Sequence, residues 1–138
     1  MKVETMTTNE RRLRRMMKGY NRERARVASL RENIAECQQM ANNGRRGGML
    51  RTFYELRVRS MAYDVETTTA ALDSLDDVLR RGLPPADREL VRLHYVDGLS
   101  WYKAARKLSL CLYHIEERGE AAFRSLASRI AFRPLTDE

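Results

Sequence analysis

The sequence predicts an all-α protein, in which a long antiparallel helical hairpin with coiled-coil-like packing is followed by a C-terminal tri-helical helix-turn-helix domain. Glycine and proline are scarce, at 7 and 3 of 138 residues, and the β-branched and aromatic clusters typical of strands are absent. Apolar residues recur at alternating steps of three and four over two long segments. Shorter amphipathic segments follow Pro85.

The first long helix is predicted from a heptad pattern that begins at Leu13. It ends at Asn42-Asn43-Gly44, so a linker is expected over residues 42–49. The pattern residues are Leu13, Met16, Tyr20, Val27, Leu30, Ile34, Cys37 and Ala41. The second pattern, which ends before Gly82, comprises Tyr54, Val58, Met61, Val65, Thr68, Leu72, Leu75 and Leu79. Each helix is then roughly 45 Å long, and the short linker favours antiparallel neighbours.

Each long helix has one narrow apolar stripe, which the other helix of the hairpin or a second copy of the chain can cover. The sequence leaves both possibilities open, and a dimer of hairpins satisfies both. A homodimer through the long helices is the expected assembly. The predicted domains are the basic hairpin arm at 1–82 and the helix-turn-helix domain at 83–131, with a tail at 132–138.

The C-terminal domain begins with a predicted helix over Ala86–Val96, which Asp97-Gly98 ends. Ser100 is a good N-cap for the next helix, whose buried face is Trp101, Ala104, Ala105 and Leu108. A turn of three to four residues through Ser109-Leu110 leads to a last helix over about Leu112 to Ala131. Small residues at 104 and 105 let that helix cross closely, which is the sequence form of a helix-turn-helix.

The basic charge belongs to the N-terminal part of the chain. The formal net charge is +7, with 15 Lys+Arg against 6 Asp+Glu up to Ser60 and 11 against 13 from Met61 onward. Because the arginine fork binds phosphate bidentately, nucleic acid is the leading predicted partner, and a solvated helix face is the alternative. The basic arm comprises Arg11, Arg12, Arg14, Arg15, Arg22, Arg24, Arg26, Arg45 and Arg46.

The segment Leu83–Ile130, "LPPADRELVRLHYVDGLSWYKAARKLSLCLYHIEERGEAAFRSLASRI", resembles region 4 of sigma-70 family factors. The matching positions are Leu83, Pro84, Arg88, Tyr95, Gly98, Leu99, Ser100, Ala105, Leu108 and Ile115. The layout of a basic helix, a linker, a long helix and a region 4-like end is similar to phage late-transcription regulators of the ArpU and RinA type.

This resemblance implies that the helix opened by Ser100 crosses the DNA backbone and that the next helix enters the major groove. The implied backbone contacts are Ser100, Lys103, Arg106, Lys107 and Arg118. The implied base-edge candidates are Leu112, Tyr113, His114, Glu116 and Glu117.

The chain departs from that pattern at several positions. Cys111 replaces the usual Ser or Thr cap, and Glu116, Glu117 and Glu120 make the reading face acidic. Gly119 within the helix costs about 1 kcal/mol relative to alanine.

The predicted function is a DNA-binding transcriptional regulator of phage or prophage type that binds double-stranded DNA. The alternatives are a protein-interaction module that docks on RNA polymerase or another partner, and a packaging component like a small terminase subunit. No acid, hydroxyl and histidine occur in an arrangement that suggests a catalytic triad, so the chain is not expected to be an enzyme.

No cofactor or metal is expected, because Cys111 and His114 have no third ligand at metal-site spacing. The two cysteines are predicted to be reduced thiols. The sequence begins without a signal-peptide pattern and contains no apolar run of membrane-spanning length. The expected location is therefore the cytoplasm, that of a bacterial host if the chain is phage-encoded.

Overall fold

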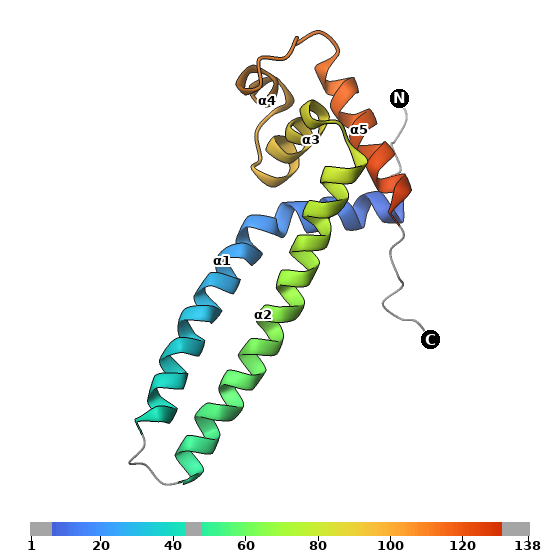
Figure 1. The fold of residues 1–138 in the computed structure, drawn as a ribbon. Helices are drawn as coiled ribbons and strands as arrows, with labels where there is room; N and C mark the ends of the chain where they lie inside the picture. Colours follow the sequence, from blue (N-terminus) through green and yellow to red (C-terminus); the bar gives the residue numbers. More distant parts are fainter. Residues whose placement is uncertain (1–6, 44–47, 131–138) are drawn as a thin grey trace. The chain divides into compact units, whose positions relative to one another are not determined.

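The computed structural model describes residues 7–43 and 48–130, whose regular structure is helical throughout (Figure 1). The elements are α1 Thr8–Asn42, α2 Gly48–Gly82, α3 Pro85–Val91, the π-helical turn η1 Arg92–Val96, α4 Trp101–Lys107 and α5 Ile115–Arg129. The predicted all-α fold, with two long helices before three shorter ones, is confirmed. Arg45, Arg46 and the predicted tail at 132–138 lie outside the described residues.

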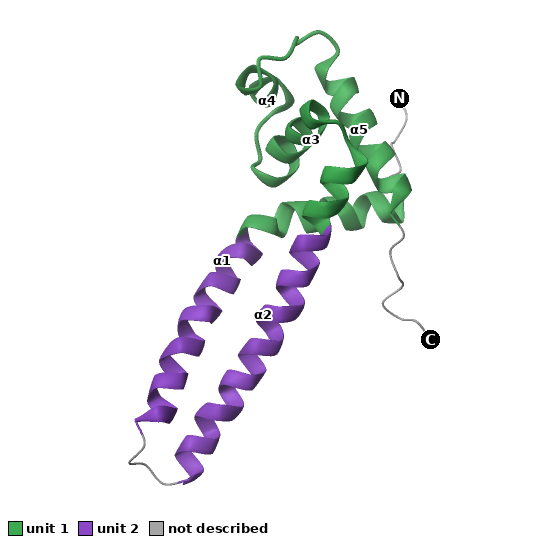
Figure 2. Ribbon diagram, in the orientation of Figure 1, with its two compact units in different colours: residues 1–21, 75–138 green, residues 22–74 purple. Residues whose placement is uncertain are grey.

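The chain forms two compact units (Figure 2). We call residues 22–74 the hairpin unit, and residues 1–21 with 75–138 the head unit. These units differ from the predicted domains, which divide at residue 82. The reason is that both long helices contribute buried residues to the head unit: Leu13 and Met17 near the start of α1, and Leu79 near the end of α2, are 0% exposed.

In the hairpin unit, α1 from residue 22 onward runs antiparallel to α2 up to residue 74 (Figure 2). Residues of the predicted stripes face the seam: Val27, Ala41 and Leu72 are buried, and the others are half-buried. Arg26 ties the helices, since its Nη1 and Nη2 donate to the Asp64 carboxylate at 2.8 and 3.3 Å, and Nη2 also donates to Thr68 Oγ1 at 2.9 Å. The helices of one chain therefore cover each other's stripe.

The head unit has a core built on Leu90, Trp101, Ala104, Ala105 and Ile115. Polar contacts fasten the long helices to the shorter ones within this unit. The Tyr20 hydroxyl of α1 donates to Asp76 of α2 at 2.8 Å, and Arg92 of η1 donates to the same carboxylate at 3.4 Å. Asn9 of α1 caps the end of α5, where its Nδ2 donates to the carbonyls of Ala127 and Ile130 at 3.3 and 3.0 Å.

The helix predicted over Ala86–Val96 is divided into α3 and a π-helical turn. Within that turn the Asp97 N–H donates to the Arg92 carbonyl at 3.2 Å, an i to i−5 bond, and the Leu99 N–H donates to the Leu93 carbonyl at 3.0 Å. The wider turn leaves Leu93 and Tyr95 half-buried against the core of the head unit.

The predicted start of the last helix is wrong by three residues. Helix α5 begins at Ile115, so the connection from α4 spans residues 108–114 and is longer than the three to four residues predicted. The chain leaves α4 through Ser109 and enters α5 through His114, which adopt left-handed conformations with φ of 58° and 57°. These two left-handed residues belong to the longer connection, so helix α5 begins later than the sequence predicts.

Candidate nucleic-acid interface

Helix α4 is anchored as the sequence predicts. Ser100 is its N-cap, and its Oγ accepts a hydrogen bond from the Lys103 N–H at 3.1 Å. The buried face of α4 consists of Trp101, Ala104 and Ala105. The N-cap and the inner face together fix which residues of this short helix point to solvent.

Gly119 lets α5 pack closely on α4. A Cβ at this position would lie 2.3–2.6 Å from three carbon atoms of the Trp101 ring. The sequence indicated Gly119 as a helix weakness, and that interpretation is incomplete: the missing Cβ makes room for the indole. The close helix crossing predicted from Ala104 and Ala105 is thus completed by a glycine on the opposite helix.

The outer face of α4 is basic. Lys103, Arg106 and Lys107 are exposed, and their spacing of three and four residues places them on one side of the helix. Tyr102, which is 50% exposed, lies beside them in sequence. The buried Trp101 holds the helix, and so its three cations, in a fixed position. Cations in fixed positions can contact the phosphate groups of a polyanion and set how the protein lies on it.

Three of the base-edge candidates precede α5 instead of opening it. Leu112, Tyr113 and His114 lie in the connection, and Tyr113 is 78% exposed. His114 is the N-cap residue of α5 without a side-chain cap bond, and Cys111 is exposed and does not cap the helix. Their exposure follows from the long connection, so they are accessible but not presented by a helix.

The first turn of α5 is acidic. Glu116 and Glu117 are exposed there, where carboxylates favour the positive end of the helix dipole. The pKa of Glu117 lies below its ordinary value, because its own backbone N–H and then the His114 side chain bond to the carboxylate. Arg118 donates through Nε to Asp87 of α3 at 2.7 Å. The helix dipole stabilises both carboxylates, these local bonds stabilise that of Glu117, and Arg118 is bonded to Asp87. The surface of the first turn is therefore anionic.

The predicted basic arm is divided between the two units. In the head unit, Arg11, Arg14 and Arg15 are exposed on α1 and Arg12 is half-buried. The sequence interpretation missed Lys18, which is exposed on the same helix four residues after Arg14. That i, i+4 spacing is a signal that could have found it.

The arm arginines of the hairpin unit contact carboxylates. Arg22 lies 3.8 Å from Glu23, Arg24 lies 3.5 Å from Asp73, and Arg26 lies 2.8 Å from Asp64. Hydrogen bonding from Arg26 holds the pKa of Asp64 below its ordinary value. The phosphate-binding candidates that share a unit with α4 are therefore those of the first turns of α1.

Two rings beneath α4 have shifted pKa values. The His94 ring stacks on Trp101 with centroids 3.7 Å apart, and its Nδ1 lies 2.7 Å from the Leu99 carbonyl oxygen. Burial lowers the pKa of His94 below 6.5. Burial also raises the pKa of Tyr95 to about 12, where its ring stacks on Phe123. Both rings pack in the core of the head unit, so we assign them a structural role.

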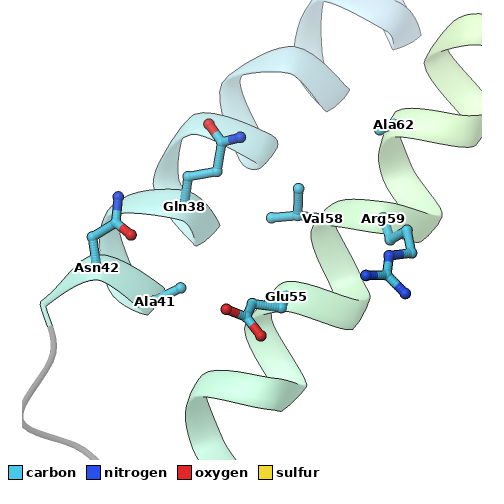
Figure 3. Close-up of a pocket in the computed structure, with 7 residues that line it drawn as sticks. All are labelled: Gln38, Ala41, Asn42, Glu55, Val58, Arg59 and Ala62. Carbon is cyan, nitrogen blue, oxygen red and sulfur yellow. The ribbon is translucent and has the colours of Figure 1, made fainter.

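The hairpin unit has an open groove between its helices (Figure 3), lined by Gln38, Ala41, Asn42, Glu55, Val58, Arg59 and Ala62. Glu55 and Arg59 are the charged residues of that lining. Across residues 7–43 and 48–130, no three His, Cys, Asp or Glu side chains are grouped to hold a metal ion. No helix in these ranges is long and apolar enough to cross a membrane.

Comparison with known proteins adds no relative to this picture. None of the protein-family models, curated proteins or solved structures that were compared with the chain matches it.

Proposed function

We propose that the protein is a DNA-binding transcriptional regulator of phage or prophage type, which acts in the cytoplasm of a bacterial host. In this proposal α4 and α5 serve as a sigma region 4-like helix-turn-helix on double-stranded DNA. The observation that carries it is the exposed set Lys103, Arg106 and Lys107 on a helix whose opposite face is fixed by Trp101. Cations held in fixed positions can bind successive phosphates along a duplex.

The charge distribution supports backbone contacts over base contacts. Glu116 and Glu117 would repel phosphates, although a carboxylate can accept a hydrogen bond from a cytosine amino group. Arg11, Arg14 and Arg15 add phosphate-binding capacity within the head unit. We therefore expect affinity to come mostly from α4 and the start of α1, with base selection from exposed residues of the connection such as Tyr113 and His114.

A salt titration of duplex binding, measured by fluorescence anisotropy, tests the proposal. The logarithm of the binding constant should fall linearly with the logarithm of salt concentration, by about 0.9 per phosphate contacted. The double variant Lys103→Gln, Lys107→Gln should reduce that slope by about 1.8. The matched control Arg31→Gln, Arg51→Gln removes the same charge from exposed sites of the hairpin unit and should change the slope much less.

Equal losses in the two double variants would mean that net charge alone causes binding, and the α4 interface would be rejected. Absence of duplex binding at low salt would reject the function. Sequencing of DNA recovered with the protein should use the triple variant Arg11→Gln, Arg14→Gln, Arg15→Gln to remove the charge of the arm, in place of an arm deletion. A deletion of the arm would also remove Leu13 and Met17, which are fully buried in the head unit.

The acidic first turn of α5 favours a second candidate function, docking on RNA polymerase or another protein partner. The variant Glu116→Gln, Glu117→Gln separates the two functions. A regulator that binds DNA should keep or gain duplex affinity, because repulsion of phosphates is reduced. A docking module should lose co-purification with polymerase while DNA affinity is unchanged. A packaging component like a small terminase subunit would instead form a ring of many subunits by mass measurement.

A further inference from the structure

Helix α2 has a second apolar stripe that its hairpin mate does not cover. Met49, Phe53, Leu56 and Tyr63 are 89%, 49%, 56% and 69% exposed. Their spacing follows a heptad with Ser60 at the intervening position. With 3.6 residues per turn, this stripe lies roughly 140° around the helix from the seam residues such as Val58 and Val65. A helix that is apolar on two faces needs a partner on each.

The outer stripe changes in side-chain size along the helix. Large residues occupy its first half, and the same heptad positions continue as Thr67, Ala70 and Ser74, all exposed. If two copies of α2 pair in opposite directions, large residues meet small ones. Leu56 then faces Thr67 of the partner subunit, and Phe53 faces Ala70 of the partner subunit. A parallel pair would place large residues against large ones and leave the small half underpacked.

The charges beside the stripe favour the same direction. Arg59 and Glu66 are exposed on one flank, seven residues apart, which is the g position of consecutive heptads. In an antiparallel pair, g positions face each other, so Arg59 meets Glu66 of the partner subunit, and symmetry repeats the contact. A parallel pair would bring Arg59 to the partner's Asp64, whose carboxylate Arg26 of its own chain already binds at 2.8 Å.

We propose that the outer stripe of α2 is a dimer interface on which a second copy of this chain packs antiparallel. The stripe and its flanking charges together specify the helix, the face, the direction and the register of the association. Ser60 lies opposite Tyr63 of the partner subunit, so the twofold axis passes between these positions. The proposed interface does not include the α4 surface. If the dimerisation test fails, the result of the DNA-binding test is unaffected.

Charge reversal in the full-length chain tests the direction and register, with the dimer dissociation constant measured by sedimentation. Arg59→Glu and Glu66→Arg should each weaken dimerisation by about fivefold to tenfold, because each creates two like-charge contacts. The double variant Arg59→Glu, Glu66→Arg should restore the affinity of the parent chain. The control Glu36→Arg, on an exposed site of α1, should leave it unchanged.

Cysteine cross-linking gives an independent readout in the background Cys37→Ser, Cys111→Ser. A mixture of Arg59→Cys chains and Glu66→Cys chains should form a disulfide-linked heterodimer, and Thr67→Cys chains alone should not cross-link. A parallel pair would reverse the second result and overturn the proposal. A chain that stays monomeric at all concentrations, or a dimer that Leu56→Asp and Arg59→Glu leave unaffected, would also overturn it.

Discussion

Ser109 adopts a backbone conformation that favours glycine. Its φ is 58°, and it closes the end of α4, where the Leu110 N–H donates to the Ala105 carbonyl at 2.8 Å and the Ser109 N–H donates to the Arg106 carbonyl at 3.1 Å. This pair of bonds is the Schellman pattern, whose left-handed position is usually glycine because a Cβ is strained there.

The variant Ser109→Gly should therefore raise the free energy of unfolding, by about 0.5–1 kcal/mol after the larger backbone entropy of unfolded glycine is subtracted. Urea denaturation checks this through the transition midpoint at constant m-value. Ser125→Gly, within α5, is the matched control and should destabilise the chain. A fall in stability for Ser109→Gly would show that the serine is not strained at this turn.

His94 should make stability depend on pH. Its pKa is lowered mainly by burial; the Leu99 carbonyl, Glu120 and Glu116 oppose that shift and Arg14 adds to it. The folded ring stays neutral where the unfolded ring, with its ordinary value of 6.5, takes up a proton. The stabilising contribution is thus present above pH 6.5 and is lost as the pH falls from there towards the folded-state pKa.

The variant His94→Gln should show a shallower decline of stability between about pH 7 and pH 5 than the parent chain. Thermal unfolding across this range measures the slope, which is unaffected by any constant loss of packing against Trp101. Asn33→Gln, at an exposed site without an ionisable group, is the control and should keep the parent slope. An unchanged slope in His94→Gln would remove His94 as the cause.

The crossing of α4 and α5 depends on Gly119. Alanine there would gain about 1 kcal/mol of helix propensity, but its Cβ would lie 2.3 Å from a Trp101 ring carbon. Relief requires the rigid indole or a helix to move, and overpacking of this kind costs about 1–3 kcal/mol. We expect Gly119→Ala to destabilise the chain, as measured by urea denaturation.

Coupling between the two positions provides the control. In the variant Trp101→Leu, Gly119→Ala should be neutral or stabilising, since the obstructing ring is gone. The coupling free energy from this double-mutant cycle should then be large for a contacting pair. Additive effects of the two substitutions would contradict a close crossing at this point.

The long helices could be predicted from the sequence because heptad spacing and the stop at Asn42-Asn43-Gly44 are local signals. Ser100 was predictable for the same reason, since an N-cap bonds to a backbone N–H only three residues away. The π-helical turn at Arg92–Val96 and the start of α5 at Ile115 were not. They depend on tertiary contacts, such as the packing of Tyr95 on Phe123, which no local pattern contains.

The candidate site was predictable to a similar extent. The resemblance to sigma-70 region 4 indicated the cations of α4, which are exposed. They could not show that Arg24 and Arg26 contact Asp73 and Asp64, which are 49 and 38 residues away along the chain. The role of Gly119 was also hidden, because a glycine in a helix indicates a weakness until the facing tryptophan is known.

The molecule as a whole depends on an N-terminal helix that also completes the C-terminal fold. Leu13 and Met17 of α1 and Leu79 of α2 are fully buried in the head unit. Asn9 also caps α5, and Tyr20 bonds to Asp76 beside Arg92. A fragment of residues 83–131, the predicted helix-turn-helix domain, lacks every one of these groups except Arg92.

We therefore expect the fragment 83–131 to lose cooperative folding. Truncation of a single fully buried Leu to Ala costs about 2–5 kcal/mol, and the fragment loses several such side chains from a total stability of only about 5–15 kcal/mol. Trp101 is the single tryptophan and is 6% exposed, so its fluorescence reports the core during urea titration. A chain that joins residues 7–21 to 75–130 through a flexible linker should recover a cooperative transition. If the fragment 83–131 unfolds with the midpoint of the full chain, the ends of the long helices do not stabilise the head unit.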